Sequence, residues 1–167
     1  MTAEKISSSA GRQLVSEMVE TARAAHKELA VSSYETRCNA LFAAAGLLRA
    51  NNANILHANE ADILAATEKG TSSAFIDRLT LTEQRIEAMA AGLEAIASLD
   101  DPLAATLDQW TRPNGLDISR ISTSLGVIGF IDESGSNVTS DAGGLCRMTG
   151  NADILRGGSG SHHTPQT

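Results

Sequence analysis

The chain has 167 residues, a formal net charge of −7 and a hydrophobic fraction of 42%. This length suffices for one domain with an apolar core and excludes two large domains, and the hydrophobic fraction excludes a disordered chain. The negative charge and the lack of a basic cluster exclude nucleic acids and anionic membranes as expected partners. The two cysteines have no metal or redox spacing, so we expect reduced thiols and no metal site. No signal peptide or membrane span is apparent, so we expect a cytoplasmic chain.

Apolar residues recur at steps of three and four through the first half of the chain, which is typical of amphipathic helices. After a flexible leader over residues 1–11, the pattern predicts helices over residues 12–30, from about 34 to 50, and over 53–67. The sequence Ser32-Ser33-Tyr34-Glu35 resembles a capping box, with Ser32 as the cap. A second capping sequence at residues 80–83 begins a helix that Asp100-Asp101-Pro102 closes. Residues 12–110 are therefore predicted to form a helical N-terminal region.

The last third of the chain changes to strand patterns. Turn residues at 111–115 precede an alternating stretch over residues 116–122, as in a half-exposed strand. Two apolar runs, Val127–Ile131 and Ala152–Leu155, then flank a helix that is predicted to begin near Thr139 and to end at Gly150. Both faces of the first run are apolar or small, which indicates a parallel strand covered on both sides, and a right-handed crossover would place the two runs side by side. The inner face of that helix is predicted to consist of Ala142, Leu145, Cys146 and Thr149.

We therefore predict an α/β fold that is mostly α-helical. A helical layer is followed by the first β-α-β unit of a truncated Rossmann-like cofactor domain, over residues 111–158, and by a flexible tail over residues 159–167.

Several short motifs in register resemble the γ-glutamyl phosphate reductase family of the aldehyde dehydrogenase superfamily. They occur in the family's order from about Met18 to Gly158. The motifs are His57–Ile63, Phe75–Leu81, Asp101-Pro102, Arg112–Leu116, Leu125–Gly129, Asn137–Thr139, Gly150–Ala152 and Ile154–Gly158. The resemblance implies reduction of L-glutamyl 5-phosphate to L-glutamate 5-semialdehyde with NADPH in proline biosynthesis, through a thioester on a nucleophilic cysteine.

The resemblance also implies two site elements. Asn137 matches the asparagine that donates its amide to the oxyanion, whereas the residues alone favour a helix cap. Arg156, Gly157, Gly158 and Ser159 match the turn that contacts the cofactor ribose and phosphates, and an arginine suits the 2′-phosphate of NADPH. A plain glycine-rich turn is the alternative.

The catalytic cysteine has no counterpart in these 167 residues, because Cys146 is predicted to be a buried packing residue with little thiolate character. Charged Asp132, Arg147 and Asp153 stand where the family has apolar side chains. Burying an unpaired charge costs roughly several kcal/mol of folding free energy, so we expect these positions to face water. We expect the chain alone to be inactive and not to bind NADPH up to millimolar concentration. The alternative is a non-catalytic structural or oligomerisation module, with a homodimer through exposed sheet edges or the helical layer.

Overall fold

The computed structural model describes residues 8–131, 136–157 and 164. In chain order the elements are α1 (Ser8–Leu29), α2 (Tyr34–Ala50), α3 (Asn52–Glu68), α4 (Ser73–Leu79), α5 (Glu83–Ala97), β1 (Thr106–Thr111), β2 (Asp117–Ile121), β3 (Val127–Ile131), α6 (Ser136–Met148) and β4 (Ala152–Arg156). The fold is mostly helical, as predicted. Within the described residues, no helix is both long and apolar enough to cross a membrane.

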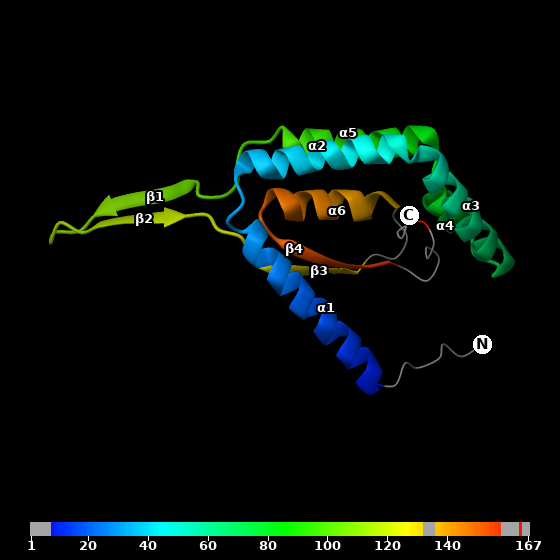
Figure 1. The fold of residues 1–167 in the computed structure, drawn as a ribbon, viewed down its shortest axis with the longest axis horizontal. Coiled ribbons are helices and arrows are strands. Elements are labelled where there is room, and N and C mark those ends of the chain that lie inside the picture. The colour runs from blue at the N-terminus through cyan, green and yellow to red at the C-terminus, as the bar shows by residue number, and fades with distance from the viewer. Residues whose placement is uncertain (1–7, 132–135, 158–163, 165–167) are drawn as a thin grey trace.

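The predicted β-α-β unit is present. β3 and β4 pair in parallel, with a register that runs from Val127 opposite Ala152 to Ile131 opposite Arg156. Helix α6 lies between this strand pair and the two helices α2 and α5, while α1 packs against the other side of the strands (Figure 1). Helices thus lie on both sides of the strand pair, but the expected two-sided burial of β3 is incomplete: none of its residues is buried and Ile131 is 77% exposed.

The core lies where α2, α5 and α6 meet. Small side chains allow these helices to approach closely: Ala45 and Ala90 are fully buried, and Gly144 of α6 faces Leu93 of α5. The cluster comprises Cys38, Leu41, Ala45, Ala90, Leu93, Ala97 and Met148. A second cluster joins α3 to α5 through Ile55, Leu81, Ile86 and Met89. The low aromatic content is therefore compensated by tight helix packing.

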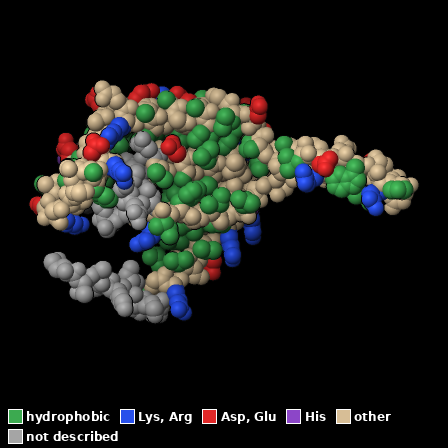
Figure 2. Space-filling model, turned by 180° about the vertical axis from the view of Figure 1, so that it is seen from behind, with side chains coloured by type: hydrophobic (Ala, Val, Ile, Leu, Met, Phe, Trp, Pro, Cys, Tyr) green, Lys and Arg blue, Asp and Glu red, His purple; other side chains and the backbone are tan. Residues whose placement is uncertain are grey.

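An antiparallel hairpin of β1 and β2 extends away from the helices as an arm (Figure 1). Its turn is closed by a hydrogen bond from the Arg112 amide to the Leu116 carbonyl, and Gly115 takes a positive φ of 82°. Seen from behind, the arm carries apolar and charged side chains next to each other (Figure 2). β2 was predicted, but β1 was not, because every β1 residue is exposed and no buried face imposes an alternating pattern.

Several local predictions were wrong. Helix α1 begins at Ser8, inside the leader predicted over residues 1–11. The cap of α2 is Ser33, whose hydroxyl accepts the Thr36 amide at 3.1 Å, while the Ser32 hydroxyl donates to the Leu29 carbonyl. Helix α6 begins at Ser136, ahead of the predicted start. Leu145, predicted to face inward, is 48% exposed, because the other side of α6 contacts the core. The short helix α4, capped by Ser72, was not predicted at all.

Candidate functional site

The described parts of the two predicted site elements lie at the carboxyl edge of the β3–β4 pair. β3 ends at Ile131 and is followed by the first turn of α6, which contains Asn137. β4 ends at Arg156, which lies opposite Ile131 in the register. The start of α6 and the end of β4 therefore lie at the same end of the layer (Figure 1). Ligands of open α/β sheets bind outside this edge, and free N–H groups at a helix start favour anions there.

At this edge Arg156 and Gly157 are exposed to solvent. An exposed guanidinium is suited to a phosphate, which it can bind with two parallel hydrogen bonds, and a helix N-terminus at the same end of the layer also favours an anion. The side chain of Asn137 and the predicted site residues Gly158 and Ser159 lie outside the described residues, as does Asp132. The structure thus brings the two predicted site elements together at the level of the backbone.

The opposite, amino edge of the strand pair is fixed by Asn151. This side chain is 3% exposed, and its Oδ1 accepts the backbone amides of Leu125 and Gly126 at 2.7 and 2.8 Å. Its Nδ2 donates to the hydroxyl of Thr149 at 2.8 Å. The motifs Leu125–Gly129 and Gly150–Ala152 are therefore two halves of one contact, which sets the register of the strands that carry the site.

Next to Asn151, the backbone of Gly150 has a φ of +66°, and a Cβ there would approach Leu103 Cδ1 to 2.8 Å. The Gly150 carbonyl also accepts a hydrogen bond from Nδ1 of His26, at 3.1 Å, when that nitrogen carries the proton. Helix α1 is thereby attached to the same amino edge. Neither His26 nor Asn151 was predicted to have a role, because their partners are backbone groups distant in sequence.

Two further motifs also form one contact. Asn59 of His57–Ile63 is 1% exposed; its Nδ2 donates to the Leu79 carbonyl at 2.9 Å, and its Oδ1 accepts the Leu81 amide at 2.8 Å. Leu79 and Leu81 belong to the motif Phe75–Leu81. An asparagine within the buried stripe of α3 was the only signal of this contact in the sequence.

Both cysteines are free and buried. Cys146 is 2% exposed, and burial, followed by the negative charge of Asp153, raises the pKa of its thiol. The thiol of Cys38 donates to the Ala97 carbonyl. These surroundings confirm that Cys146 is a packing residue, because a neutral buried thiol is a poor nucleophile. Among the described residues, no three His, Cys, Asp or Glu side chains are grouped to hold a metal ion.

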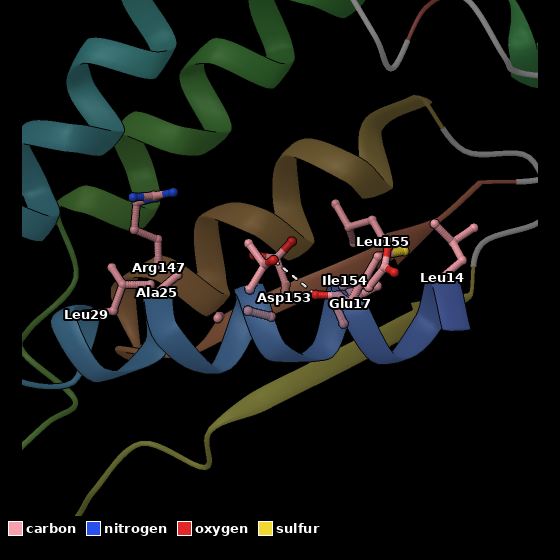
Figure 3. A pocket seen from close by; sticks show the side chains of 12 residues that line it. Leu14, Glu17, Ala25, Leu29, Arg147, Asp153, Ile154 and Leu155 are labelled. Carbon is pink, nitrogen blue, oxygen red and sulfur yellow. Dashed lines mark hydrogen bonds between the residues drawn. The ribbon is translucent and has the colours of Figure 1, made fainter. Parts of the chain in front are cut away.

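A groove of about 540 Å³ runs between α1 and β4 (Figure 3). Its walls are largely apolar, with the acidic side chains of Glu17 and Asp153 and the guanidinium of Arg147 among them. Arg147 is exposed, as expected, whereas Asp153, which was also expected to face water, is half-buried. The two carboxylates make this groove a poor site for phosphates, which leaves the carboxyl edge as the better candidate.

Comparison with known proteins gives a consistent set of relatives. No protein-family model matches the chain. It is 50% identical over 161 residues to γ-glutamyl phosphate reductase of Parvibaculum lavamentivorans, covering 94% of this chain and 38% of that protein. It is also 50% identical over 153 residues to the enzyme of that name from Paramagnetospirillum magneticum, covering 92% of this chain and 36% of that protein.

Solved structures agree. The γ-glutamyl phosphate reductase of Thermotoga maritima superposes with a TM-score of 0.89 at 33% identity, over 91% of this chain and 37% of that one. The γ-glutamyl phosphate reductase of Saccharomyces cerevisiae superposes with a TM-score of 0.86 at 30% identity, over 90% of this chain and 38% of that one. A putative aldehyde dehydrogenase of Bacillus subtilis superposes with a TM-score of 0.65 at 20% identity, over 91% of this chain and 31% of that one. This likeness shows a shared fold. The chain therefore spans less than two fifths of the length of these relatives.

Proposed function

We propose, since this chain belongs to the γ-glutamyl phosphate reductase family, that it forms the N-terminal portion of an NADPH-dependent reductase of proline biosynthesis. The substrate is L-glutamyl 5-phosphate and the product is L-glutamate 5-semialdehyde. The observation that supports the proposal is that Arg156 and the start of α6 lie at the same end of the strand pair, in a chain that is 50% identical to such an enzyme over 161 residues.

In this proposal each site element has one task. Arg156 binds the 2′-phosphate of NADPH, and the turn formed with Gly157, Gly158 and Ser159 offers backbone amides to the cofactor. Asn137, in the first turn of α6, donates its side-chain amide to the oxygen that becomes negative when the acyl phosphate is attacked. NADPH, when bound, supplies the hydride.

We further propose that these 167 residues alone do no chemistry. The acyl transfer needs a thiolate that can reach the substrate carbonyl. The thiols of Cys38 and Cys146 are both buried in helix packing, and burial raises the pKa of Cys146. The nucleophile must therefore come from outside these residues.

The experiment that tests the proposal joins this chain to the remaining portion of the P. lavamentivorans relative. We expect the chimera to reduce glutamyl phosphate with NADPH. Arg156→Ala is expected to raise the KM for NADPH about 10- to 100-fold, the loss of one hydrogen bond to a charged group. Arg120→Ala, which removes an exposed arginine from the hairpin arm, is the matched control. A folded chimera without activity contradicts the proposal.

The isolated chain provides the complementary measurement. We expect NADPH fluorescence to stay unchanged up to millimolar concentration, because one turn supplies only part of a dinucleotide site. Micromolar binding that Arg156→Ala abolishes and Arg120→Ala retains would contradict this expectation.

A second candidate function is self-association as a structural module. In the described part of the chain, β3 and β4 pair only with each other, so each has an unpaired outer edge. Such edges favour pairing with a second copy. We expect a dimer in sedimentation velocity at high protein concentration, and a monomer at all concentrations would contradict this candidate.

A further inference from the structure

A buried polar pair on α3 lies outside the proposed chemistry. Asn59 and Asp62 share one face of the helix with Ile55 and Ala66, since residues three and four apart point the same way. Asn59 is 1% exposed and Asp62 is 2% exposed. A carboxylate at this depth is costly unless hydrogen bonds compensate for its lost hydration.

Part of that compensation comes from Thr164. Its backbone amide donates to Asp62 Oδ2 at 2.8 Å, and its hydroxyl contacts the same oxygen at 2.7 Å. The side-chain amide of Asn59 donates to the Thr164 hydroxyl at 3.2 Å. The hydroxyl therefore acts as donor and acceptor at once, which only a serine or threonine can do at this position.

Asn59 is also held by contacts that do not involve Thr164. Asn59 is oriented by its bonds to the Leu79 carbonyl and the Leu81 amide, so its Nδ2 is directed at the hydroxyl by the backbone of the α4–α5 connection. Asp62 is one helical turn further along α3. Pre-organised partners lose little entropy when they bind, which favours recognition of a specific side chain.

We propose that Asn59 and Asp62 are positioning residues, forming a buried anchor that recognises the amide and hydroxyl of Thr164 and so restricts the movement of Gly157 after β4. Arg156 is fixed by its pairing with Ile131 in the sheet. Thr164 is fixed by Asp62. Two fixed points this close in sequence limit the conformations open to Gly157, which directly follows β4. That Gly157 serves a cofactor rests on the proposed function, whereas the anchor does not.

The test measures the anchor in the absence of nucleotide, so it stands or fails independently of NADPH binding. Amide hydrogen exchange and chemical shifts are recorded by NMR for the ¹⁵N-labelled chain. The variants are Thr164→Val, which keeps the shape and removes the hydroxyl, and Thr164→Ser, which retains the hydroxyl. Thr67→Val is the matched control, because the Thr67 hydroxyl bonds only within α3 among the contacts of the described residues.

We expect the amide of residue 164 to exchange at least about tenfold more slowly than an unprotected amide in the wild type and in Thr164→Ser, and to lose this protection in Thr164→Val. The Gly157 amide resonance is expected to shift in Thr164→Val alone. Thr164→Val is also expected to melt about 2–4 °C lower. The anchor is overturned if the amide of residue 164 is unprotected in the wild type, or if Thr164→Ser loses as much exchange protection as Thr164→Val. An unmoved Gly157 resonance in Thr164→Val overturns the positioning role.

Discussion

The side-chain oxygen of Asn151 accepts the backbone amide of Gly126 at 2.8 Å, joining the entrance of β4 to the entrance of β3. The same oxygen accepts the Leu125 amide. One residue thus satisfies two backbone donors before the parallel ladder begins. Without it, both amides would lose this partner, one at half-buried Gly126 and one at Leu125, which is 87% exposed.

Asn151→Ala is therefore expected to lower the free energy of unfolding by about 1–3 kcal/mol, the cost of an orphaned donor at half-buried Gly126, whereas the amide of exposed Leu125 can bond to water. Urea unfolding followed by circular dichroism measures the change. The control is Asn54→Ala, an exposed asparagine on α3, with an expected change below about 0.5 kcal/mol. Equal effects of the two substitutions would contradict the role given to Asn151.

Two adjacent glycines in α6 should respond in opposite directions. A Cβ at Gly144 would lie 2.7 Å from Leu93 Cδ2 and 3.1 Å from Ile96 Cδ1, so Gly144→Ala is expected to destabilise the chain by about 1–3 kcal/mol. A Cβ at Gly143 would meet nothing within 4 Å, so Gly143→Ala is expected to stabilise the helix by about 0.5–1 kcal/mol. Thermal and urea unfolding of both variants decide the matter. Parallel changes in the two variants would be inconsistent with this packing of α6 against α5.

Stability is expected to fall at acid pH through a clamp between α2 and α5. Arg49 binds Glu87 at 2.7 Å and also contacts Glu94, and these bonds lower the pKa of both carboxyl groups from 4.5. Because the folded-state pKa lies below that of the unfolded chain, the contribution is complete above about pH 4.5 and is lost as pH falls through the folded-state values. All three side chains are partly exposed, so the effect is small and sensitive to salt.

This clamp is measured as the melting temperature between about pH 6 and pH 3. We expect the double variant Glu87→Gln, Glu94→Gln to show a flatter pH dependence than the wild type. The double variant Glu20→Gln, Glu28→Gln changes the net charge equally on α1 and serves as control. If the pH dependence of the melting temperature flattens equally in this control, the effect comes from net charge and not from the clamp.

Neither thiol is expected to react readily in the folded chain. Burial raises the pKa of Cys146, and Cys38 is buried in the core cluster. Cys38→Ser isolates Cys146, and Cys146→Ser isolates Cys38, so a colorimetric disulfide reagent reports each thiol separately. We expect both to react more than about tenfold faster in urea than in buffer. A Cys146 that reacts in buffer as fast as an unfolded thiol would reopen its candidacy as a nucleophile.

The sequence predicted the elements whose residues face an apolar partner on a regular period. The helices α1, α2, α3 and α5 and the strands β3 and β4 all have such a face. By contrast, β1 is exposed on both sides, and α4 is only seven residues long, so neither produces a readable period. Their existence depends on the hairpin turn at Gly115 and on the cap at Ser72.

The candidate site could be predicted only in part for a related reason. The crossover rule places Arg156 and the start of α6 at one edge from the order of elements alone. The roles of Asn151 and Asn59 could not be foreseen, because these side chains bond to backbone amides and a carbonyl twenty or more residues away. Backbone groups are nearly the same in every residue, so the sequence does not reveal which of them a side chain will bond.

The attachment of α1 to the β3–β4 pair has a consequence for how the chain folds during synthesis. Helix α1 is synthesised well before its partners: His26 bonds to Gly150, 124 positions later, and the groove wall of α1 faces β4. The contacts between α2 and α5 can form earlier, from segments closer in sequence. Until β4 is synthesised, Leu14 and Met18 lack the strand that lines their groove and are more exposed than the 54% and 40% of the folded chain, which favours the binding of chaperones to this apolar stripe.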